Sequence, residues 1–250
     1  MSYLLYTQIG TFRIDIPSLY VEFDRRDGYD WIDFCLKQKG SFSSIHHWIL
    51  ENFVNEDSTV VDIGAHIGVF AIPASKKAKK VIAFEPVIES FQRLADHIVL
   101  NEATNIVPYN FALGEDLSLA ELEYCPKFNT GGATLNISRG SLQIPDLGDE
   151  HAPPKYPILV KTLDSLELEA CDFIKCDTEG CELLVVRGGL ETIKKFRPVM
   201  VMEHNYREES EEVLKLLESV GVQYKCSPIH DPDMTNKDAD TDYLYEPMKY

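Results

Sequence analysis

The sequence predicts an α/β fold in which helices cover both faces of a mostly parallel sheet. One observation is an apolar run that ends at Asp62, followed by Gly64 and Gly68 and then by an apolar pattern of helical spacing. This is the order of a buried strand, a tight turn and a helix that opens a nucleotide-binding α/β domain. The second observation is that further apolar runs alternate with helical patterns, and repeats of strand and helix form parallel sheets.

Each element is predicted from the period of its apolar residues. Seven strands are expected in the main sheet, at residues 60–62, 81–84, 106–111, 173–177, 199–202, 222–226 and 242–245. Helices are expected at residues 43–54, 67–78, 88–101, 181–195 and 208–220. Residues 3–24 alternate polar and apolar positions around two turns, which predicts two or three short strands. Residues 115–170 interrupt the strand–helix rhythm, so we expect an inserted β-hairpin or lid there.

The length and composition predict one large domain with an N-terminal extension. The chain has 250 residues, and 44% of them are hydrophobic, which is enough for a core. We expect a β/α extension at residues 1–54, packed on the core. The ligand-binding domain is expected at residues 55–250, with an insertion at about 115–160.

Charge and cysteine content disfavour several classes of partner. The formal net charge is −17, and phosphate backbones and anionic lipid would repel such a chain. The N-terminus lacks the features of a signal peptide, and no run approaches the roughly 20 apolar residues of a membrane helix. Six cysteines form no C-x-x-C pair, which favours reduced thiols. We therefore expect a cytoplasmic protein that binds neither nucleic acid nor membrane, and the sequence predicts no oligomeric state.

The glycine spacing narrows the choice of ligand. A dinucleotide fingerprint reads G-x-G-x-x-G, and its second glycine lets the backbone approach a pyrophosphate. Here that position holds His66, whose side chain would crowd a diphosphate. The turn at residues 64–68 therefore favours a nucleoside without phosphates, of which S-adenosylmethionine is the common one.

Acidic side chains lie where four of the predicted strands end, and ligands of open parallel sheets bind outside these carboxyl ends. The residues delivered to this edge are Asp62, Glu85, Asn110–Ala112, Asp177, Glu179, Glu203 and His204. Glu85 can accept hydrogen bonds from both hydroxyls of a ribose, and the segment that starts at Asn110 can border a base. We interpret the set as functional, because helix capping alone does not explain acids at four strand ends.

These segments resemble the FkbM family of S-adenosylmethionine-dependent methyltransferases, over roughly residues 60–205. The matching blocks are 60–68 (VVDIGAHIG), 84–86 (FEP) with Asn101 downstream, 112–114 (ALG), 131–135 (GGATL), 162–166 (TLDSL), 174–182 (IKCDTEGCE), and Arg197-Pro198 to Glu203-His204. The K-x-D-x-E-G-x-E block is the most specific of them. The departures are His66, where the family often has asparagine, and Cys176 and Cys181, where aliphatic or small residues are usual.

The resemblance implies a Rossmann-like class I methyltransferase fold with S-adenosylmethionine as cofactor. The turn at residues 64–68 would hold the methionine part, whose carboxylate is favoured near a helix N-terminus. Glu85 would hold the ribose. The cofactor-binding residues expected from the motifs and the resemblance are Asp62, Gly64, Ala65, His66, Gly68, Glu85, Pro86, Asn110 and Ala112.

The implied reaction is an in-line displacement in which an acceptor atom attacks the methyl group and loses a proton. Asp177, Glu179 and His204 are the predicted catalytic residues, and one of them takes this proton. Histidine has the better pKa for this work at neutral pH, although His204 beside Glu203 also fits a packing or capping role. No metal is predicted, but a magnesium ion held by Asp177 and Glu203 stays an alternative.

The leading hypothesis is O-methylation of a hydroxyl group on a small molecule or a sugar. One alternative is N-methylation of an amide or amine, such as a peptide side chain. Another is a non-catalytic module that keeps the cofactor fold for binding. A nicotinamide oxidoreductase is disfavoured by the missing second glycine.

Four other polar residues are interpreted as structural. His46 and His47 are adjacent, so they point to different faces of their helix and cannot hold a metal together. Asp164 precedes a helix-like segment that it is expected to cap. Glu182 is expected to support the turn at Gly180.

Overall fold

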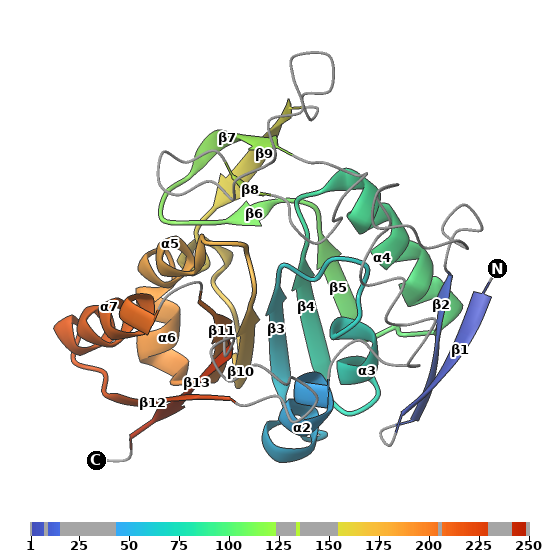
Figure 1. Ribbon diagram of the computed structural model, residues 1–250, viewed down its shortest axis with the longest axis horizontal. Coiled ribbons are helices and arrows are strands. Elements are labelled where there is room, and N and C mark those ends of the chain that lie inside the picture. Colours follow the sequence, from blue (N-terminus) through green and yellow to red (C-terminus); the bar gives the residue numbers. More distant parts are fainter. Residues whose placement is uncertain are drawn as a thin grey trace.

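The computed structural model describes residues 2–7, 10–15, 44–123, 134–135, 155–204, 207–229 and 242–248, and its centre is a seven-stranded sheet (Figure 1). The strands are β3 (Thr59–Ile63), β4 (Lys80–Phe84), β5 (Ile106–Tyr109), β10 (Phe173–Cys176), β11 (Val199–Glu203), β12 (Tyr224–Pro228) and β13 (Asp242–Pro247). Their order is β12-β13-β11-β10-β3-β4-β5. Strand β13 runs antiparallel to its two neighbours, whereas β11, β10, β3, β4 and β5 pair in parallel. The predicted mostly parallel seven-stranded sheet is therefore confirmed.

Helices cover both faces of the sheet, as predicted (Figure 1). One face carries α2 (Ser44–Phe53), α3 (Ala71–Ser75) and α4 (Ile88–Leu100), and the other carries α5 (Glu182–Arg187), α6 (Leu190–Phe196) and α7 (Arg207–Ser219). Successive side chains of each strand point to opposite faces, so a strand that is covered on both sides is apolar throughout. Val60 and Phe173 enter the core under α2 and α3, whereas Val61 and Ile174 enter the core under α5 to α7.

Strand β3 is the point at which later strands change from one side of the sheet to the other. From β3 the chain continues outward to β4 and β5 on one side, and β10 and β11 lie on the other side. Such a switch point leaves a crevice at the carboxyl ends of the two central strands, where ligands of open α/β sheets bind. In this chain the two strand ends are those of β3 and β10, which lead into Gly64 and Asp177.

A second sheet begins at the same edge. It contains β6 (Ala112–Leu113), β7 (Ser118–Glu123), β8 (Thr134–Leu135) and β9 (Lys155–Lys161), in the order β6-β9-β7-β8. Strands β7 and β9 pair antiparallel, as expected of an inserted hairpin, and bury Leu122, Ile158 and Val160 against Val87. In Figure 1 this sheet lies at one end of the central sheet. Its role as a lid stays a prediction.

The N-terminal strands are β1 (Ser2–Thr7) and β2 (Gly10–Asp15), which form an antiparallel hairpin. This confirms the short strands predicted at the start of residues 3–24, of which residues 16–24 lie outside the described residues. The boundary near residue 54 between an extension and the main domain stays a prediction.

Three predicted elements have the wrong extent. The helix predicted at residues 67–78 is reduced to α3, because the glycine turn continues as far as Phe70. The helix predicted at residues 181–195 is broken into α5 and α6 at Gly188 and Gly189. Gly188 must be a glycine, because a Cβ there would lie 1.9 Å from the Gly114 carbonyl oxygen. The strand predicted at residues 106–111 ends at Tyr109, where the chain bends towards the second sheet.

Asp164 caps a helix, but not the one that the sequence predicted. It begins a single 3-10 turn at Asp164–Leu166, yet its carboxylate accepts the amide N–H groups of Glu191 (3.1 Å) and Thr192 (2.7 Å) in the first turn of α6. A side-chain oxygen at a helix N-terminus satisfies amides that have no partner within the helix. The long loop before β10 is thereby fixed to α6.

Two findings bear on the expectations from composition. Every helix in the described ranges is too short or too polar to span a bilayer. Cys171, Cys176, Cys181 and Cys226 are free thiols, which agrees with the expectation of reduced cysteines for these four.

Candidate functional site

The glycine turn between β3 and α3 is fastened to the end of β4. The amides of Gly64 and Ala65 donate to the Phe84 carbonyl oxygen at 3.0 and 2.9 Å. The Glu85 carboxylate accepts the His66 amide at 2.7 Å through Oε2 and the Val87 amide at 2.8 Å through Oε1. Glu85 is buried, and each of its oxygens retains a further lone pair for a ligand hydroxyl.

Gly64 follows β3 and lies against Asp177, the residue that follows β10. Its φ of 79° belongs to the left-handed region, and a Cβ at this position would lie 1.8 Å from the Asp177 carbonyl oxygen. Gly68 also has a positive φ, 92°, and an added Cβ would lie 2.8 Å from Leu94 Cδ1 of α4. The two glycines therefore let the turn fit between β10 and α4.

His66 occupies the turn between the two glycines. It has a φ of 50°, which is uncommon for a residue with a side chain, and its ring is buried. Burial lowers the pKa of His66 to about 3, and the positive charge of Arg93 contributes in the same direction. The imidazole is therefore neutral at physiological pH.

Acidic residues form a row across the carboxyl edge of the sheet. Cys176 pairs with both Ile63 and Met202, so the residues that follow them, Asp177, Gly64 and Glu203, lie level with one another. Glu203 is in turn paired with Asp242 of β13. Because the register of a parallel sheet places level residues on the same face, the acids predicted at separate strand ends are brought together.

A buried lysine lies beneath this row. Lys175 is 6% exposed, and its Nζ donates to Asp177 Oδ2 at 3.0 Å. Burial lowers the pKa of Lys175, but the negative charges of Asp177 and Asp62 outweigh it, so the pKa lies above its usual value. Lys175 was not among the predicted site residues. A charged residue in the buried strand sequence Phe173-Ile174-Lys175-Cys176 is the signal that identifies it.

Asp177 and Glu203 share a hydrogen bond and titrate as a pair. Burial raises the pKa of Asp177, but the Lys175 charge and the Glu203 hydrogen bond reverse the effect, so Asp177 stays ionised. For Glu203, burial and the neighbouring Asp177 charge both raise the pKa. Glu203 therefore holds a proton that it donates to Asp177.

Glu179 is partly exposed at the turn after β10. Its φ of 56° places it in the left-handed region, which a glutamate seldom occupies. Burial raises the pKa of Glu179 to about 7, and the charges of Asp177 and Glu182 add to the rise. Strained backbone of this kind is often found at functional positions.

Glu182 supports the turn that presents Glu179, as predicted. Its Oε1 accepts the Thr178 amide at 2.7 Å, the Thr178 hydroxyl at 2.8 Å and the Gly180 amide at 3.3 Å. Three donors on one buried oxygen hold the backbone of residues 178–180 in a single conformation.

His204 is held inside the protein by β13. It is 2% exposed, its Nε2 lies 2.7 Å from the Tyr245 hydroxyl, and its Nδ1 lies 3.7 Å from Glu209 Oε2. Burial lowers the pKa of His204 to about 4, so the ring is neutral at pH 7. This geometry favours the packing role, and its role as base stays a prediction.

Asn110 joins the ends of β4 and β5. Its side-chain amide donates to the carbonyl oxygens of Glu85 (2.8 Å) and Pro86 (3.1 Å). Beside it, the Tyr109 ring stacks on Phe84 with centroids 5.3 Å apart, and the Phe111 ring packs against Phe84 at a tilt of 53°, with centroids 5.4 Å apart. Ala112 is buried at the start of β6. The predicted contacts of these residues with a base stay predictions.

His46 lies close to the site, although we expected it to be structural. Its ring packs edge-on against Phe70, with centroids 5.2 Å apart, and it interacts electrostatically with Lys175 and Asp177. Burial and then the Lys175 charge lower the pKa of His46 to about 3. Its place depends on how α2 packs on the sheet, which the helical pattern alone does not predict.

Asp62 is a buried carboxylate that no described group satisfies. It is 0% exposed, and neither of its oxygens has a hydrogen-bond partner. Burial raises the pKa of Asp62 to about 6. The Lys175 charge opposes the rise, and so does the Ala71 amide, which is too poorly aligned to form a hydrogen bond. Buried polar groups without a partner are costly and rare, so Asp62 is suited to a ligand that brings a donor or a positive charge.

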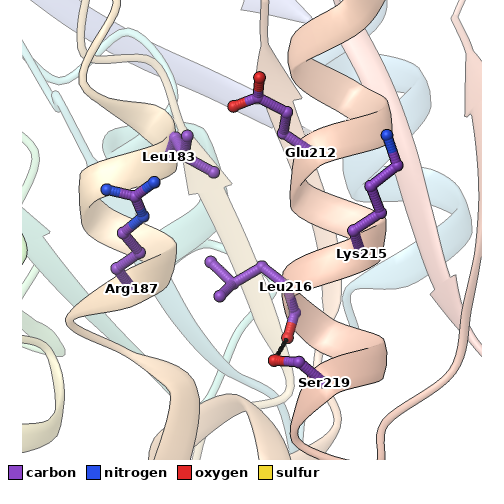
Figure 2. Close-up of a pocket in the computed structure, with 6 residues that line it drawn as sticks. All are labelled: Leu183, Arg187, Glu212, Lys215, Leu216 and Ser219. Carbon is purple, nitrogen blue, oxygen red and sulfur yellow. Dashed lines mark hydrogen bonds between the residues drawn. The ribbon is translucent and has the colours of Figure 1, made fainter.

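No metal site is evident in the part of the chain that the structure describes, where no three His, Cys, Asp or Glu side chains are grouped to hold an ion. The two residues considered for magnesium, Asp177 and Glu203, share a proton, and Lys175 supplies the positive charge beside them. A shallow groove of about 350 Å³ lies elsewhere, between α5 and α7 (Figure 2). It is lined by Leu183, Arg187, Glu212, Lys215, Leu216 and Ser219, none of which belongs to the row of acids.

Comparison with known proteins places this site in a family. Residues 62–224 match the model of the methyltransferase FkbM domain, which is more than half of the chain. The chain belongs to the FkbM methyltransferase family. The matched domain starts at Asp62 and includes the glycine turn, Glu85 and Asp177. His46 lies before it in the sequence.

Two curated relatives match only in part. Methyltransferase 1 of Beauveria bassiana is 28% identical over 148 residues, covering 53% of this chain and 59% of the relative. The hexuronic acid methyltransferase AglP of Haloferax volcanii is 29% identical over 151 residues, covering 60% of this chain and 57% of the relative. The chain therefore spans less than two thirds of the length of either protein.

A solved structure shares the fold. The methyltransferase FkbM of Methylobacillus flagellatus KT aligns with a TM-score of 0.50 at 19% identity, over 76% of this chain and 43% of that one. With the strand order described above, this confirms the predicted Rossmann-like class I methyltransferase fold of the FkbM domain.

The contact between Gly64 and Asp177 generates a stability prediction. Gly64→Ala should destabilise the protein by about 3 kcal/mol or more, because the methyl group overlaps backbone and the left-handed conformation adds strain. Gly221→Ala is the matched control: its φ is 80°, but an added Cβ meets no heavy atom within 4 Å. It should cost only about 1 kcal/mol. Urea unfolding of both variants measures the difference, and equal losses would contradict the close approach of the two strand ends.

Proposed function

We propose that this chain transfers a methyl group from S-adenosylmethionine to a hydroxyl oxygen of an uncharged small molecule or sugar. The observation that carries the cofactor assignment is the buried, unsatisfied Asp62 carboxylate beside the glycine turn. S-adenosylmethionine brings an ammonium group and a sulfonium charge, both of which a buried carboxylate favours. Family membership supports the same cofactor.

The residues around the crevice fit the parts of this cofactor. The turn at residues 64–68 would hold the methionine part with Asp62, Ala65 and His66. Glu85 would accept the ribose hydroxyls with its remaining lone pairs, and the segment at Pro86 and 110–112 would border the adenine. The cofactor supplies a methyl group activated by positively charged sulfur. Alignment of the acceptor oxygen is then the main task of the protein.

We assign the proton-accepting role to Glu179. A general base works best when its pKa lies near the working pH and when it can reach the substrate. Glu179 is partly exposed and has a pKa of about 7, whereas Asp177 is paired with Lys175 and His204 is buried against Tyr245. In this proposal the acceptor hydroxyl gives its proton to the Glu179 carboxylate as its oxygen attacks the methyl group. Asp177, Glu203 and His46 border the acceptor.

The electrostatics favour a hydroxyl over an amine as acceptor. Glu179, Asp177 and Asp242 would stabilise the protonated form of an amine, which has no lone pair for attack. A hydroxyl remains neutral beside these groups and needs only a base. The relative AglP is described as a hexuronic acid methyltransferase, which supports a sugar as acceptor. The acidic row of this chain favours an uncharged sugar.

Calorimetry tests the cofactor. We expect the chain to bind S-adenosylmethionine and not NADH. Glu85→Gln should weaken binding of S-adenosylmethionine at least tenfold, because an amide cannot accept two N–H bonds and hold two ribose hydroxyls as well. Glu121→Gln, at an exposed position in β7, is the control and should bind like the wild type. Binding of NADH alone would refute the proposal, and an unchanged dissociation constant for Glu85→Gln would remove the ribose assignment.

The pKa of Glu179 predicts how the rate depends on pH. A base acts only when deprotonated, so turnover should fall below pH 7 and rise to a plateau above it. Glu179→Gln should remove this dependence and lower turnover about 100-fold. The assay follows S-adenosylhomocysteine formed with an acceptor found by screening neutral sugars and polyols. Glu167→Gln is the control, since Glu167 also has a positive φ, 47°, but lies outside the acidic row. A Glu179→Gln enzyme with the wild-type profile would show that another group takes the proton.

A further inference from the structure

Helix α4 presents a buried stripe to the glycine turn. Ser90, Leu94, His97 and Asn101 are buried and follow one another at spacings of four, three and four residues, so they lie on one face of the helix. Leu94 fills the space that Gly68 leaves by having no side chain. One turn further along α4, His97 reaches the backbone of the same turn.

His97 makes a hydrogen bond to that backbone. Its Nδ1 lies 2.7 Å from the Ile67 carbonyl oxygen, and the side chain is 1% exposed. A carbonyl oxygen only accepts, so the ring must carry its hydrogen on Nδ1 and donate it. The carbonyl of His97 accepts the Asn101 side-chain amide at 2.8 Å, and Lys76 donates to the Asn101 carbonyl at 2.9 Å. The end of α4 that carries His97 is thus fastened to the segment after α3.

The turn is therefore held from two sides at consecutive residues. Glu85, at the end of β4, accepts the N–H of His66, and His97 donates to the C=O of Ile67. Between these two bonds lies the residue with the unusual φ of 50°. A conformation of this kind persists only where the surroundings fix it, and these two side chains do so.

We propose that His97 is a positioning residue for the cofactor: its imidazole fixes the Ile67 carbonyl and so holds the turn at residues 64–68 in the shape that receives S-adenosylmethionine. The inference rests on the proposed function and extends it to a residue of α4 that does not touch the reacting atoms. Binding sites that are rigid before the ligand arrives lose less entropy on binding. Loss of the His97 bond should therefore lower affinity for the cofactor more than it affects the reaction of bound substrates.

Two substitutions separate the hydrogen bond from packing. His97→Leu keeps an apolar side chain of moderate size but removes the donor. His97→Asn is smaller but retains an N–H donor near the position of Nδ1. We expect the leucine variant to bind S-adenosylhomocysteine about tenfold more weakly by calorimetry and the asparagine variant to remain within threefold of the wild type. In kinetics, KM for S-adenosylmethionine should rise with little change in kcat. Equal affinity of the leucine variant and the wild type, with both folded, would overturn the proposal.

A measurement without cofactor makes failure of this inference distinguishable from failure of the proposed function. In the wild-type protein, long-range ¹H–¹⁵N NMR should show His97 with its hydrogen on Nδ1. Amide hydrogen exchange at residues 64–68 should be about tenfold faster in His97→Leu than in His97→Asn. A hydrogen on Nε2 of the wild type would refute the His97–Ile67 hydrogen bond even if the leucine variant failed to fold, and equal exchange rates in two folded variants would refute its role in holding the turn. If the His97–Ile67 hydrogen bond is found to hold the turn but the wild type binds no S-adenosylmethionine, the proposed function is wrong.

Discussion

The site depends on the close approach of two strand ends. The end of β3 passes so near the end of β10 that a Cβ on Gly64 would lie 1.8 Å from the Asp177 carbonyl oxygen. This contact places the glycine turn beside the residues that follow β10. The parallel pairing of β10 with β11 brings Glu203 to the same level, and the antiparallel pairing of β11 with β13 adds Asp242. Because the turn leaves the sheet at this point, Glu85 at the end of β4 and His97 of α4 can both form hydrogen bonds to its backbone.

A second constraint is electrostatic. Several carboxyl groups lie together in a partly buried place, and their mutual repulsion must be relieved for the protein to fold. Lys175 supplies one positive charge from below, and the proton held by Glu203 removes one negative charge. Glu179 lies at the partly exposed end of this group, where burial, followed by repulsion from Asp177 and Glu182, raises its pKa to about 7. The same arrangement of charges thus also helps to set the pKa of Glu179, the group that we assign as base.

Most of the sheet and the acidic strand ends could be predicted from the sequence, because both follow from local patterns. The period of apolar residues identifies β3, β4, β10 and β11, and a parallel sheet brings their carboxyl ends together. Lys175 and His97 were not predicted, and His46 was interpreted as structural, because their positions depend on how helices pack and on which side chains meet across the sheet. The break between α5 and α6 was missed for a similar reason, since Gly188 is required by a contact with Gly114, far away in the sequence. His204, by contrast, was predicted as a catalytic residue from its type and its place at a strand end, but the structure buries it against Tyr245.

The most direct test of the account is a crystal structure of the chain grown with S-adenosylhomocysteine, the product that the proposed reaction leaves behind. We predict that it lies across the carboxyl ends of β3 and β4, with its amino-acid part at Gly64–Gly68, its ribose against Glu85 and its sulfur facing Asp177 and Glu179. Binding in the groove between α5 and α7, or an orientation with the adenine at the glycine turn, would contradict the central claim.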